Sequence, residues 1–291
     1  MGINFQEVSF AYYIPRKKRL PINFILRDIN LHIDFSGEFI AIVGHTGSGK
    51  STLVQLMNAL NLPTTGKVII DDKVITAKPK FKLKNIRKQV GLVFQFPEYQ
   101  IFEETVLTDI MFGPKNFGYS LEEARERAIE AAKIVGLEEE LLNRSPFTLS
   151  GGQMRKVAIA GIIASDPQVV VLDEPTVGLD PKTKEELLLF LEKLNTEKNK
   201  TIILITHDMD VVGRFCKRVI VMKKGQVVFD GPKNELFLRE DLKETYNLDY
   251  PEVMQIMRNI RNKLNIDLDV CQYTAYDAYC ELKRKLGDKN E

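Results

Sequence analysis

A glycine-rich stretch reads Gly44-His45-Thr46-Gly47-Ser48-Gly49-Lys50-Ser51-Thr52 and has the spacing of a phosphate-binding loop. Glycines allow backbone N–H groups to approach and surround the β- and γ-phosphates of a nucleotide. A helix that begins at Lys50 would add a favourable dipole. We expect Lys50 to neutralise the phosphate oxygens and the Ser51 hydroxyl to bind Mg²⁺. Residues 44–52, called the phosphate loop below, are therefore predicted to bind a nucleotide.

Two carboxylates, Asp173 and Glu174, directly follow the apolar residues 169–172. Sheets of parallel strands bring charge to a bound phosphate at the carboxyl ends of their buried strands. Asp173 is expected to hold Mg²⁺ through water, and Glu174 to polarise or deprotonate the attacking water. Taken alone, an acidic pair after a strand would be a helix cap or a solvated turn. Its place in the order of motifs, and the Pro175-Thr176 that follows it, favour a catalytic role.

Gln95 and His207 each follow another short apolar run, at residues 90–94 and 202–205. Gln95 is expected to contact the Mg²⁺ ion or the water that attacks the nucleotide. His207 is expected to form a hydrogen bond with the γ-phosphate. Alone, Gln95 would be an ordinary edge residue and His207 a structural histidine. Their places at strand ends of one predicted sheet favour catalytic roles for both.

The elements that must hold these residues follow from the hydrophobic pattern. Continuous apolar runs at residues 38–43, 90–94, 169–172 and 202–205 are typical of parallel strands buried on both faces. Antiparallel strands are predicted where apolar and polar residues alternate, at residues 3–10 and 25–34, and a hairpin at residues 219–222 and 226–229.

Helical spacing of apolar residues dominates from about residue 97 to residue 164. This block is predicted to be a helical subdomain inserted into the sheet domain. Helices are expected within it at residues 105–112, 121–135 and 151–164, and outside it from residue 50 to about residue 63 and at residues 182–194.

After Gly231-Pro232 the chain becomes helical and more polar, and residues 236–291 are predicted to form a C-terminal helical extension. Two amphipathic helices are expected there. Their apolar faces either pack on the main domain or form a dimerisation surface. These faces comprise Val253, Ile256, Met257, Ile260 and Leu264 in one helix and Tyr273, Tyr276, Tyr279, Leu282 and Leu286 in the other.

Composition limits the function classes further. A chain of 291 residues with 44% hydrophobic and 28% charged residues is expected to be globular, as one large domain with a small appendage. A net charge of +1 argues against the general basic field of nucleic-acid binders. Three cysteines without CxxC spacing indicate a reducing cytosol and argue against structural zinc. No apolar run is long enough to span a bilayer, and no signal peptide is expected, so a membrane role would require a partner. Residues 15–21 are expected to form a basic, solvated hairpin loop. The alternative is that this loop contacts anionic lipid headgroups.

The stretch Leu149-Ser150-Gly151-Gly152-Gln153, called the signature segment below, lies between the phosphate loop and the acidic pair. With the ordered motifs around it, it resembles the ATP-binding-cassette (ABC) proteins over roughly residues 3–235. The resemblance implies an α/β P-loop NTPase fold with a mixed sheet core, an antiparallel β subdomain and a helical subdomain at about residues 97–164. The ABC ATPase domain would cover residues 1–235.

In ABC proteins the signature segment reaches the γ-phosphate that a second protomer holds. The resemblance therefore implies that Ser150, Gly151, Gly152 and Gln153 bind the partner's ATP. Residues 178–180, called the aspartate turn below, would face the partner protomer through Asp180. Tyr12 is expected to stack on adenine. Tyr13 is the alternative, and core packing is open for either.

Three segments resemble more closely the ATPases of energy-coupling factor (ECF) transporters, which drive uptake of vitamins and, in related systems, of cobalt or nickel. These segments are residues 91–102, residues 149–161 and the helical extension. His45-Thr46, Met154, Glu174-Pro175-Thr176 and the aspartate turn resemble the A-prime subunit rather than the A subunit.

This resemblance implies an ATP- and Mg²⁺-dependent ATPase, peripheral at the cytoplasmic face of the cell membrane. Its partners would be a paralogous A subunit in a heterodimer, a transmembrane coupling subunit docked near Gln95 to Glu104, and exchangeable vitamin-binding membrane subunits. Glu98, Glu103 and Glu104 are candidates to receive arginines of the coupling helices, or are solvent-exposed carboxylates. Phe96, Tyr99, Ile101 and Phe102 favour a docking groove.

Two other functions stay open at this stage. One is the ATPase of a different importer, for cobalt or nickel or dependent on a binding protein. The other is a non-transport ABC ATPase that acts on DNA or ribosomes. Such proteins usually carry a long coiled-coil insertion or two cassettes, and this chain has neither. No nucleic-acid partner is expected.

Overall fold

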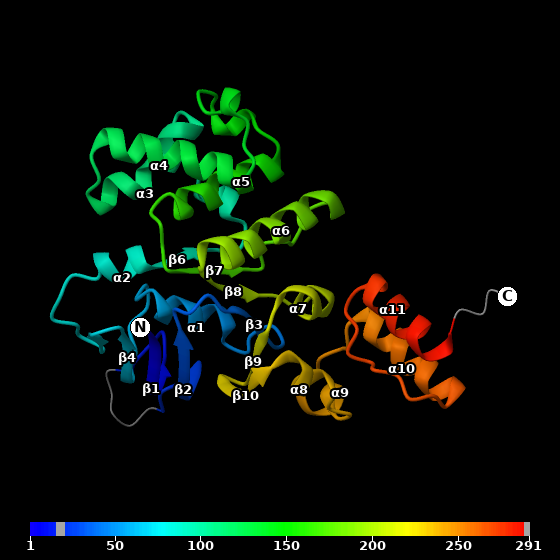
Figure 1. Ribbon diagram of the computed structural model, residues 1–291. Coiled ribbons are helices and arrows are strands. Elements are labelled where there is room, and N and C mark those ends of the chain that lie inside the picture. Colours follow the sequence, from blue (N-terminus) through cyan, green and yellow to red (C-terminus); the bar gives the residue numbers. More distant parts are fainter. Residues whose placement is uncertain (16–20, 288–291) are drawn as a thin grey trace.

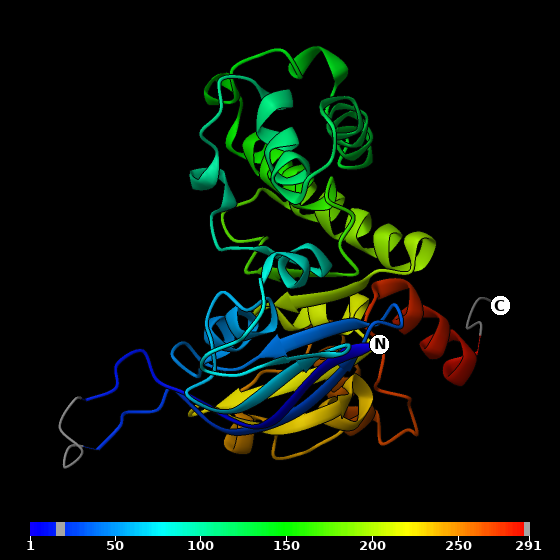
Figure 2. The same cartoon turned by 90° about the vertical axis from the view of Figure 1, so that its left-hand side faces the viewer.

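The computed structural model describes residues 1–15 and 21–287, arranged as a helical lobe above two packed sheets (Figures 1 and 2). Most of the predicted basic loop, residues 16–20, lies outside the described residues. The larger sheet has six strands in the order β10-β9-β3-β8-β7-β6, and the smaller has four in the order β2-β1-β4-β5. No helix of the described residues is long and apolar enough to cross a bilayer.

The six-stranded sheet contains the predicted parallel strands. Neighbouring strands β3, β8, β7 and β6 are parallel, as are β3 and β9, and β10 returns antiparallel to β9. The carboxyl ends of the parallel strands therefore meet at one edge, where the predicted site residues follow them. The strands are β3 (Phe39–Val43), β6 (Val90–Val93), β7 (Val169–Asp173), β8 (Thr201–Ile205), β9 (Arg218–Lys223) and β10 (Gln226–Pro232).

Both faces of this sheet are covered, which explains its continuous apolar runs. In β3, Phe39 and Ala41 face one hydrophobic core, while Ile40 and Ile42 face the other. This alternation is the two-residue period of a strand. The first core joins the sheet to the helical subdomain, to α6 (Pro181–Lys198) and to α7 (Met209–Phe215). The second joins it to the smaller sheet and to α1 (Lys50–Met57).

The antiparallel subdomain pairs β1 (Gly2–Phe10) with β2 (Leu26–Asp34), as predicted. The sequence did not predict β4 (Thr65–Ile70), β5 (Lys73–Ile75) or the short helix α2 (Lys84–Gln89). Helix α1 ends at Met57, several residues before the predicted end. The Asn58 side chain accepts a hydrogen bond from the Leu60 N–H at 3.0 Å and stabilises the turn that terminates the helix.

The helical subdomain is built on three helices that each begin with a capping box. In these boxes the hydroxyl of Thr105, Ser120 or Ser150 accepts from the N–H three residues later, whose side chain accepts in return. Helix α3 extends beyond the predicted residue 112. The elements are η1 (Pro97–Gln100), α3 (Val106–Phe117), α4 (Leu121–Ile134), η2 (Glu139–Leu141), η3 (Pro146–Thr148) and α5 (Gly151–Ile163).

Helix α8 (Lys233–Phe237) begins three residues before the predicted C-terminal extension. The extension contains α9 (Leu242–Tyr246), α10 (Glu252–Leu264) and α11 (Ala275–Leu286), and α10 contacts α7 (Figure 1). The predicted apolar faces are only partly internal. Helix α10 buries Met254 and Met257, because that line of the helix faces the main domain. The predicted stripes leave five side chains exposed, namely Ile256, Leu264, Tyr276, Tyr279 and Leu286.

Gly225, in the turn between β9 and β10, joins the two sheets behind the phosphate loop. Its N–H donates to the Ser48 carbonyl at 3.0 Å, and its carbonyl accepts from the Arg27 N–H at 2.9 Å. Its φ is +79°, and a Cβ atom there would lie 2.1 Å from the Ile25 carbonyl oxygen. Only glycine fits this turn without displacing its neighbours.

Candidate nucleotide-binding and hydrolysis site

The phosphate loop runs from the end of β3 to the start of α1, as predicted. Gly44, Gly47 and Gly49 all have positive φ values, of 141°, 78° and 102°. At Gly44 a Cβ atom would lie 2.2 Å from the Met222 carbonyl oxygen, so the loop lies directly against β9. The glycines therefore fix a tight loop whose exposed side is lined by backbone.

Lys50 folds back over this loop. Its ammonium group donates to the carbonyls of Gly44 at 2.6 Å and His45 at 3.1 Å. Burial lowers the pKa of Lys50, and the negative charges of Glu174 and Asp173 oppose this decrease. A cation held among carbonyls and carboxylates at the mouth of a glycine loop is suited to bind phosphate oxygens.

A pocket of about 370 Å³ opens over the loop. It brings together residues from the ends of β3, β6 and β7, as predicted, whereas His207, which follows β8, is not among the residues that line it. Its lining residues are Ile25, Thr46, Gly47, Gly49, Lys50, Ser51, Thr52, Gln95, Asp173 and Glu174.

A larger cavity, of about 680 Å³, lies elsewhere, between α4 and the ends of α5 and α6. It is lined by side chains of both charges, including Glu123, Arg127 and Lys198. Among its lining residues there is no glycine loop and no residue of the predicted motifs. We therefore assign the nucleotide to the smaller pocket.

Asp173 is buried at the tip of β7 and accepts a hydrogen bond from the Ser51 hydroxyl. Burial raises the pKa of Asp173, while the hydrogen bond from Ser51 and the charge of Lys50 oppose the increase. Asp173, Ser51 and Gln95 line the same pocket and supply a carboxylate, a hydroxyl and an amide oxygen as possible ligands. Such a set fits Mg²⁺, which binds one or two carboxylates together with phosphate oxygens and water.

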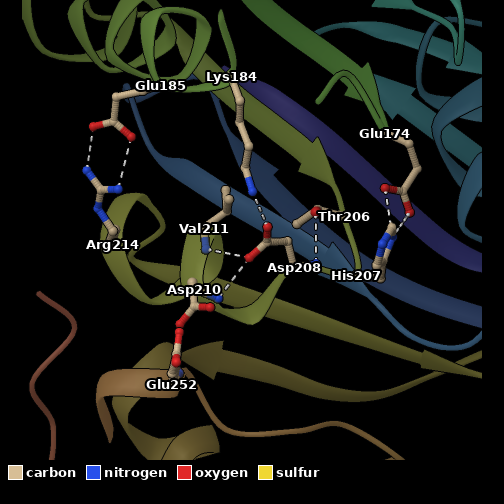
Figure 3. A network of polar contacts seen from close by, with 10 residues as sticks. All are labelled: Glu174, Lys184, Glu185, Thr206, His207, Asp208, Asp210, Val211, Arg214 and Glu252. Atoms are coloured by element: carbon tan, nitrogen blue, oxygen red, sulfur yellow. Dashed lines mark hydrogen bonds and ion pairs between the residues drawn. The ribbon is translucent and has the colours of Figure 1, made fainter. Parts of the chain in front are cut away.

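Glu174 and His207 form a hydrogen-bonded pair (Figure 3). The Nδ1 atom of His207 lies 3.0 Å from each carboxylate oxygen of Glu174. Glu174 has a φ of +49°, an uncommon conformation for a residue that is not glycine, and its N–H donates to the Ile205 carbonyl at 3.0 Å. The end of β8 thus holds both the backbone of Glu174 and the histidine that contacts its side chain.

Tyr12 makes a polar contact with the phosphate loop, and no such contact is seen for its neighbour Tyr13 among the described residues. The Tyr12 hydroxyl is 3.0 Å from the Thr52 hydroxyl, and the Tyr12 ring packs edge to face on Phe10 with centroids 4.9 Å apart. Both tyrosines are mostly exposed, which argues against core packing for either. Tyr12 therefore presents a ring beside the loop.

The signature segment leads into α5, which starts at Gly151. Ser150 caps the helix: its hydroxyl accepts from the Gln153 N–H at 3.3 Å, and the Gln153 side chain accepts from the Ser150 N–H at 3.0 Å. Gly151 is exposed, with open space where a Cβ atom would lie. Of the described residues, none from the signature segment lines the phosphate-loop pocket. The exposed amino end of α5 is thus free to receive an anion from another molecule.

Asp180, at the end of the aspartate turn, caps α6. Its carboxylate accepts from the N–H groups of Lys182 and Thr183, both at 3.1 Å, and from the Thr183 hydroxyl at 2.6 Å. The hydrogen bonds from Thr183 keep the pKa of Asp180 below its usual value. Asp180 is exposed and lies outside the phosphate-loop pocket, so within one chain it serves as a helix cap.

The sequence did not predict the role of Arg155. This side chain is 6% exposed and forms an ion pair with Glu98, which is 14% exposed. Although burial opposes it, the hydrogen bonds and charge of Arg155 keep the pKa of Glu98 below its usual value. Glu98 was a candidate to receive a partner's arginine, and in this structure its carboxylate is paired with an arginine of the same chain. Only the position of a charged residue on a buried helix could have signalled this contact.

Comparison with known proteins agrees with this geometry. A family model described as ABC transporter matches residues 26–177. The energy-coupling factor transporter ATP-binding protein EcfA2 of Bacillus cereus is 49% identical over 98% of this chain and 97% of its own length. The EcfA2 of Clostridium tetani is 49% identical over 99% of each chain.

The chain is an ABC transporter ATPase of the energy-coupling factor family. The EcfA2 designation of these relatives agrees with the predicted A-prime type of ECF ATPase. Solved structures agree with the fold of the ECF ATPase. CbiO1 from Clostridium perfringens, part of the ABC transporter complex cbiONQ, has a TM-score of 0.71 and 34% identity over 90% of this chain and 95% of its own.

A dimeric ABC cassette, MJ0796 in a post-hydrolysis state bound to ADP and phosphate, has a TM-score of 0.69 and 35% identity. It covers 79% of this chain and 98% of its own length. The predictions of an ABC P-loop fold, of ATP binding and of ATPase activity in this ECF ATPase are therefore confirmed.

Proposed function

We propose that this chain hydrolyses ATP to drive the uptake of vitamins or other micronutrients through an ECF-type importer. One observation carries the proposal. The phosphate loop, Gln95, Asp173 and Glu174 line one pocket, and His207 contacts Glu174. The chain that holds them is 49% identical along 98% of its length to ECF transporter ATP-binding proteins. Motif order and family membership thus point to the same activity.

The phosphate loop binds the nucleotide. Backbone N–H groups of residues 44–52 surround the β- and γ-phosphates, and Lys50 exchanges its loop carbonyls for phosphate oxygens. Ser51, Gln95 and Asp173 would hold a Mg²⁺ ion, which supplies charge stabilisation to the phosphates when bound. Tyr12 provides a ring for adenine, with Tyr13 as the alternative.

The Glu174–His207 pair performs the hydrolytic step. Glu174 accepts a proton from water as that water attacks the γ-phosphorus, and the bond from the γ-phosphorus to the bridging oxygen of the departing ADP breaks. His207 holds the carboxylate in position through Nδ1 and uses the other edge of its ring to contact the γ-phosphate. Gln95, at the end of β6, orients the attacking water.

A second ATPase protomer completes the site. Ser150 and Gly151 are exposed at the amino end of α5, and together with Gly152 and Gln153 they would bind the partner's γ-phosphate. Asp180 would face the same partner. MJ0796, a related cassette, is a dimer. We propose a paralogous A subunit as the partner, with residues 236–291 contributing exposed Ile256, Tyr276 and Tyr279 to the dimer contact.

The segment after Gln95 docks a transmembrane coupling subunit. Phe96, Tyr99 and Phe102 are exposed, and Phe102 stacks edge to face on Phe112. The segment that follows Gln95 therefore carries an exposed apolar surface. With Glu98 occupied by Arg155, Glu103 and Glu104 are the carboxylates that would receive arginines of the coupling helices. This docking would place the chain on the cytoplasmic face of the membrane, beside exchangeable vitamin-binding subunits.

A second candidate is the ATPase of a cobalt or nickel importer. The similarity to CbiO1, part of the cbiONQ complex, favours it. The identity to that protein is 34%, against 49% to the EcfA2 proteins, so the vitamin-type importer is the better supported of the two.

The test is affinity purification of the tagged chain from detergent-solubilised membranes, followed by identification of its partners. We expect a paralogous ATPase, one polytopic coupling protein and several small membrane proteins that bind vitamins. Recovery of a dedicated metal-binding membrane protein would favour the second candidate. Recovery of ribosomes or DNA in place of membrane proteins would contradict both.

A further inference from the structure

We propose that the ion pair between Lys184 and Asp208 positions His207, so that ATP hydrolysis depends on where the aspartate turn lies. Lys184 belongs to the helix that the aspartate turn begins, and Asp208 is the residue after His207 (Figure 3). Both would be positioning residues that contact neither ATP nor the attacking water. This coupling rests on the hydrolytic role proposed above for His207, and it would connect the partner-facing turn to that histidine.

Asp208 fixes the backbone on the carboxyl side of His207. Its N–H donates to the hydroxyl of Thr206, which is buried, at 3.1 Å. One carboxylate oxygen accepts from the N–H groups of Asp210 and Val211, at 3.0 and 3.1 Å, and so caps α7. The other oxygen accepts from the Lys184 ammonium group at 2.5 Å. The Asp208 carboxylate thus links α7 and α6, with one oxygen bonded to each helix.

Lys184 connects Asp208 to the aspartate turn. Its N–H donates to the Asp180 carbonyl at 2.9 Å in the first turn of α6, and the Asp180 carboxylate caps that same helix. Residues 180–184 therefore form one short, internally bonded unit. A displacement of the aspartate turn by a partner protomer carries Lys184 with it and acts directly on Asp208.

His207 needs this support because its side chain is 74% exposed. Its ring is held in place by the hydrogen bonds to Glu174, while surrounding packing contributes little. The orientation of the ring is therefore set by its backbone, between buried Thr206 and half-buried Asp208. A small rotation of this segment would separate Nδ1 from the Glu174 carboxylate, to which it is 3.0 Å away.

A second ion pair joins the same two helices and provides a matched control. Arg214, in the last turn of α7, donates to both oxygens of Glu185 at 2.6 and 3.0 Å. The side chains of Arg214 and Glu185 are 36% and 41% exposed, which is similar to the 34% and 25% of the first pair. This pair lies at the end of α7 away from His207. The Glu185–Arg214 pair therefore joins α6 to α7 but is not linked to His207.

The experiment compares variants in the complex purified from membranes. Asp208→Asn removes the charge but keeps a good helix cap, and Lys184→Met removes the charge but keeps the aliphatic chain. Each should lower kcat about tenfold, since small displacements of catalytic groups have effects of this size or larger. The KM for ATP and the melting temperature should change little. The double variant should be no slower than either single variant, because both remove one interaction.

The control variant carries Glu185→Gln and Arg214→Met and should keep kcat within twofold of the unchanged complex. An equal loss of kcat in this control would overturn the proposal, because helix docking alone would then explain the effect. Unchanged kcat in Lys184→Met would also overturn it. A loss of kcat that matches a loss of folded protein, measured by thermal unfolding, would assign the pair a structural role instead.

Discussion

The Arg155 guanidinium donates to both carboxylate oxygens of Glu98, at 2.8 and 3.1 Å. The same guanidinium donates to the carbonyls of Pro175 at 2.9 Å and Val177 at 2.7 Å. Arg155 lies one turn into the signature helix α5, Glu98 lies just after Gln95, and the two carbonyls precede the aspartate turn. One side chain therefore joins three segments that each have a role in the proposed ATPase cycle.

Arg155→Met is expected to destabilise the protein by about 3 kcal/mol, because it leaves the Glu98 carboxylate and two carbonyls without their donor in a nearly buried site. Chemical denaturation of the purified chain measures this change. Arg214→Met removes an arginine from a partly exposed pair and should cost less than about 1 kcal/mol. Equal losses in the two variants would contradict a special role for the buried pair.

Glu174→Gln should retain ATP binding and lower the rate of hydrolysis by about 10²-fold to 10⁴-fold, which is the usual effect of removing a general base. Single-turnover hydrolysis and ATP titration in the assembled complex separate these two quantities. Glu240→Gln, an exposed glutamate in the extension, is the control and should leave both unchanged. Near-normal turnover in Glu174→Gln would exclude Glu174 as the base.

Asp173→Asn should stabilise the nucleotide-free protein at neutral pH while abolishing hydrolysis. Burial raises the pKa of Asp173, so the folded chain binds a proton more readily than the unfolded chain. The wild-type protein therefore loses stability as pH rises from about 4, the ordinary value for aspartate, through the raised pKa. The variant lacks this decrease.

The measurement for Asp173→Asn is urea unfolding without nucleotide at several pH values between about 4 and 8. The stability difference between variant and wild type should grow with rising pH and reach about 1 kcal/mol, a typical gain when a functional buried group is neutralised. A difference that shrinks with rising pH would show that the hydrogen bond from Ser51 and the charge of Lys50 outweigh burial.

Tyr12→Ala should raise the dissociation constant for ATP about tenfold, since loss of an aromatic stack on a base costs roughly 1–3 kcal/mol. Tyr13→Ala is the matched control, because it removes a neighbouring exposed tyrosine that lacks the contact with Thr52. It should change the dissociation constant less than twofold. The opposite result would assign the adenine contact to Tyr13.

Gly225→Ala should lower the free energy of unfolding by about 2 kcal/mol or more and weaken ATP binding. The new methyl group would meet the Ile25 carbonyl at 2.1 Å, in a backbone conformation with φ of +79°. Calorimetric titration with ATP and chemical denaturation measure the two effects. Gly287→Ala is the control, because Gly287 also has a positive φ, of +73°, but no atom of the described residues lies within 4 Å of its added Cβ atom.

The parallel strands could be predicted to within a residue because burial on both faces leaves an uninterrupted apolar run. For example, residues 169–172 were predicted and β7 spans Val169–Asp173. In contrast, β4 and β5 were missed. β4 begins with three exposed residues, Thr65-Gly66-Lys67, and β5 has only three residues, so their patterns are too short to give a period.

The candidate site likewise contains residues that the sequence could place and residue pairs that it could not. The phosphate loop, Gln95, Asp173 and Glu174 follow strand ends, so knowledge of the sheet places them in one pocket. Arg155 with Glu98, and Lys184 with Asp208, are separated by 57 and 24 residues in the sequence. Their pairing depends on how helices pack, and no local pattern encodes it.

The position of Gly225 bears on how variants of this chain would be interpreted. The residue lies far along the chain from the phosphate loop, belongs to none of the nucleotide motifs and does not line their pocket. Nevertheless, its N–H group holds the Ser48 carbonyl from behind. A genetic screen for loss of transport would recover changes at Gly225 alongside changes at Lys50. A map of tolerated substitutions would then mark a turn of the sheet as part of the ATP site, although no atom of that turn needs to touch ATP.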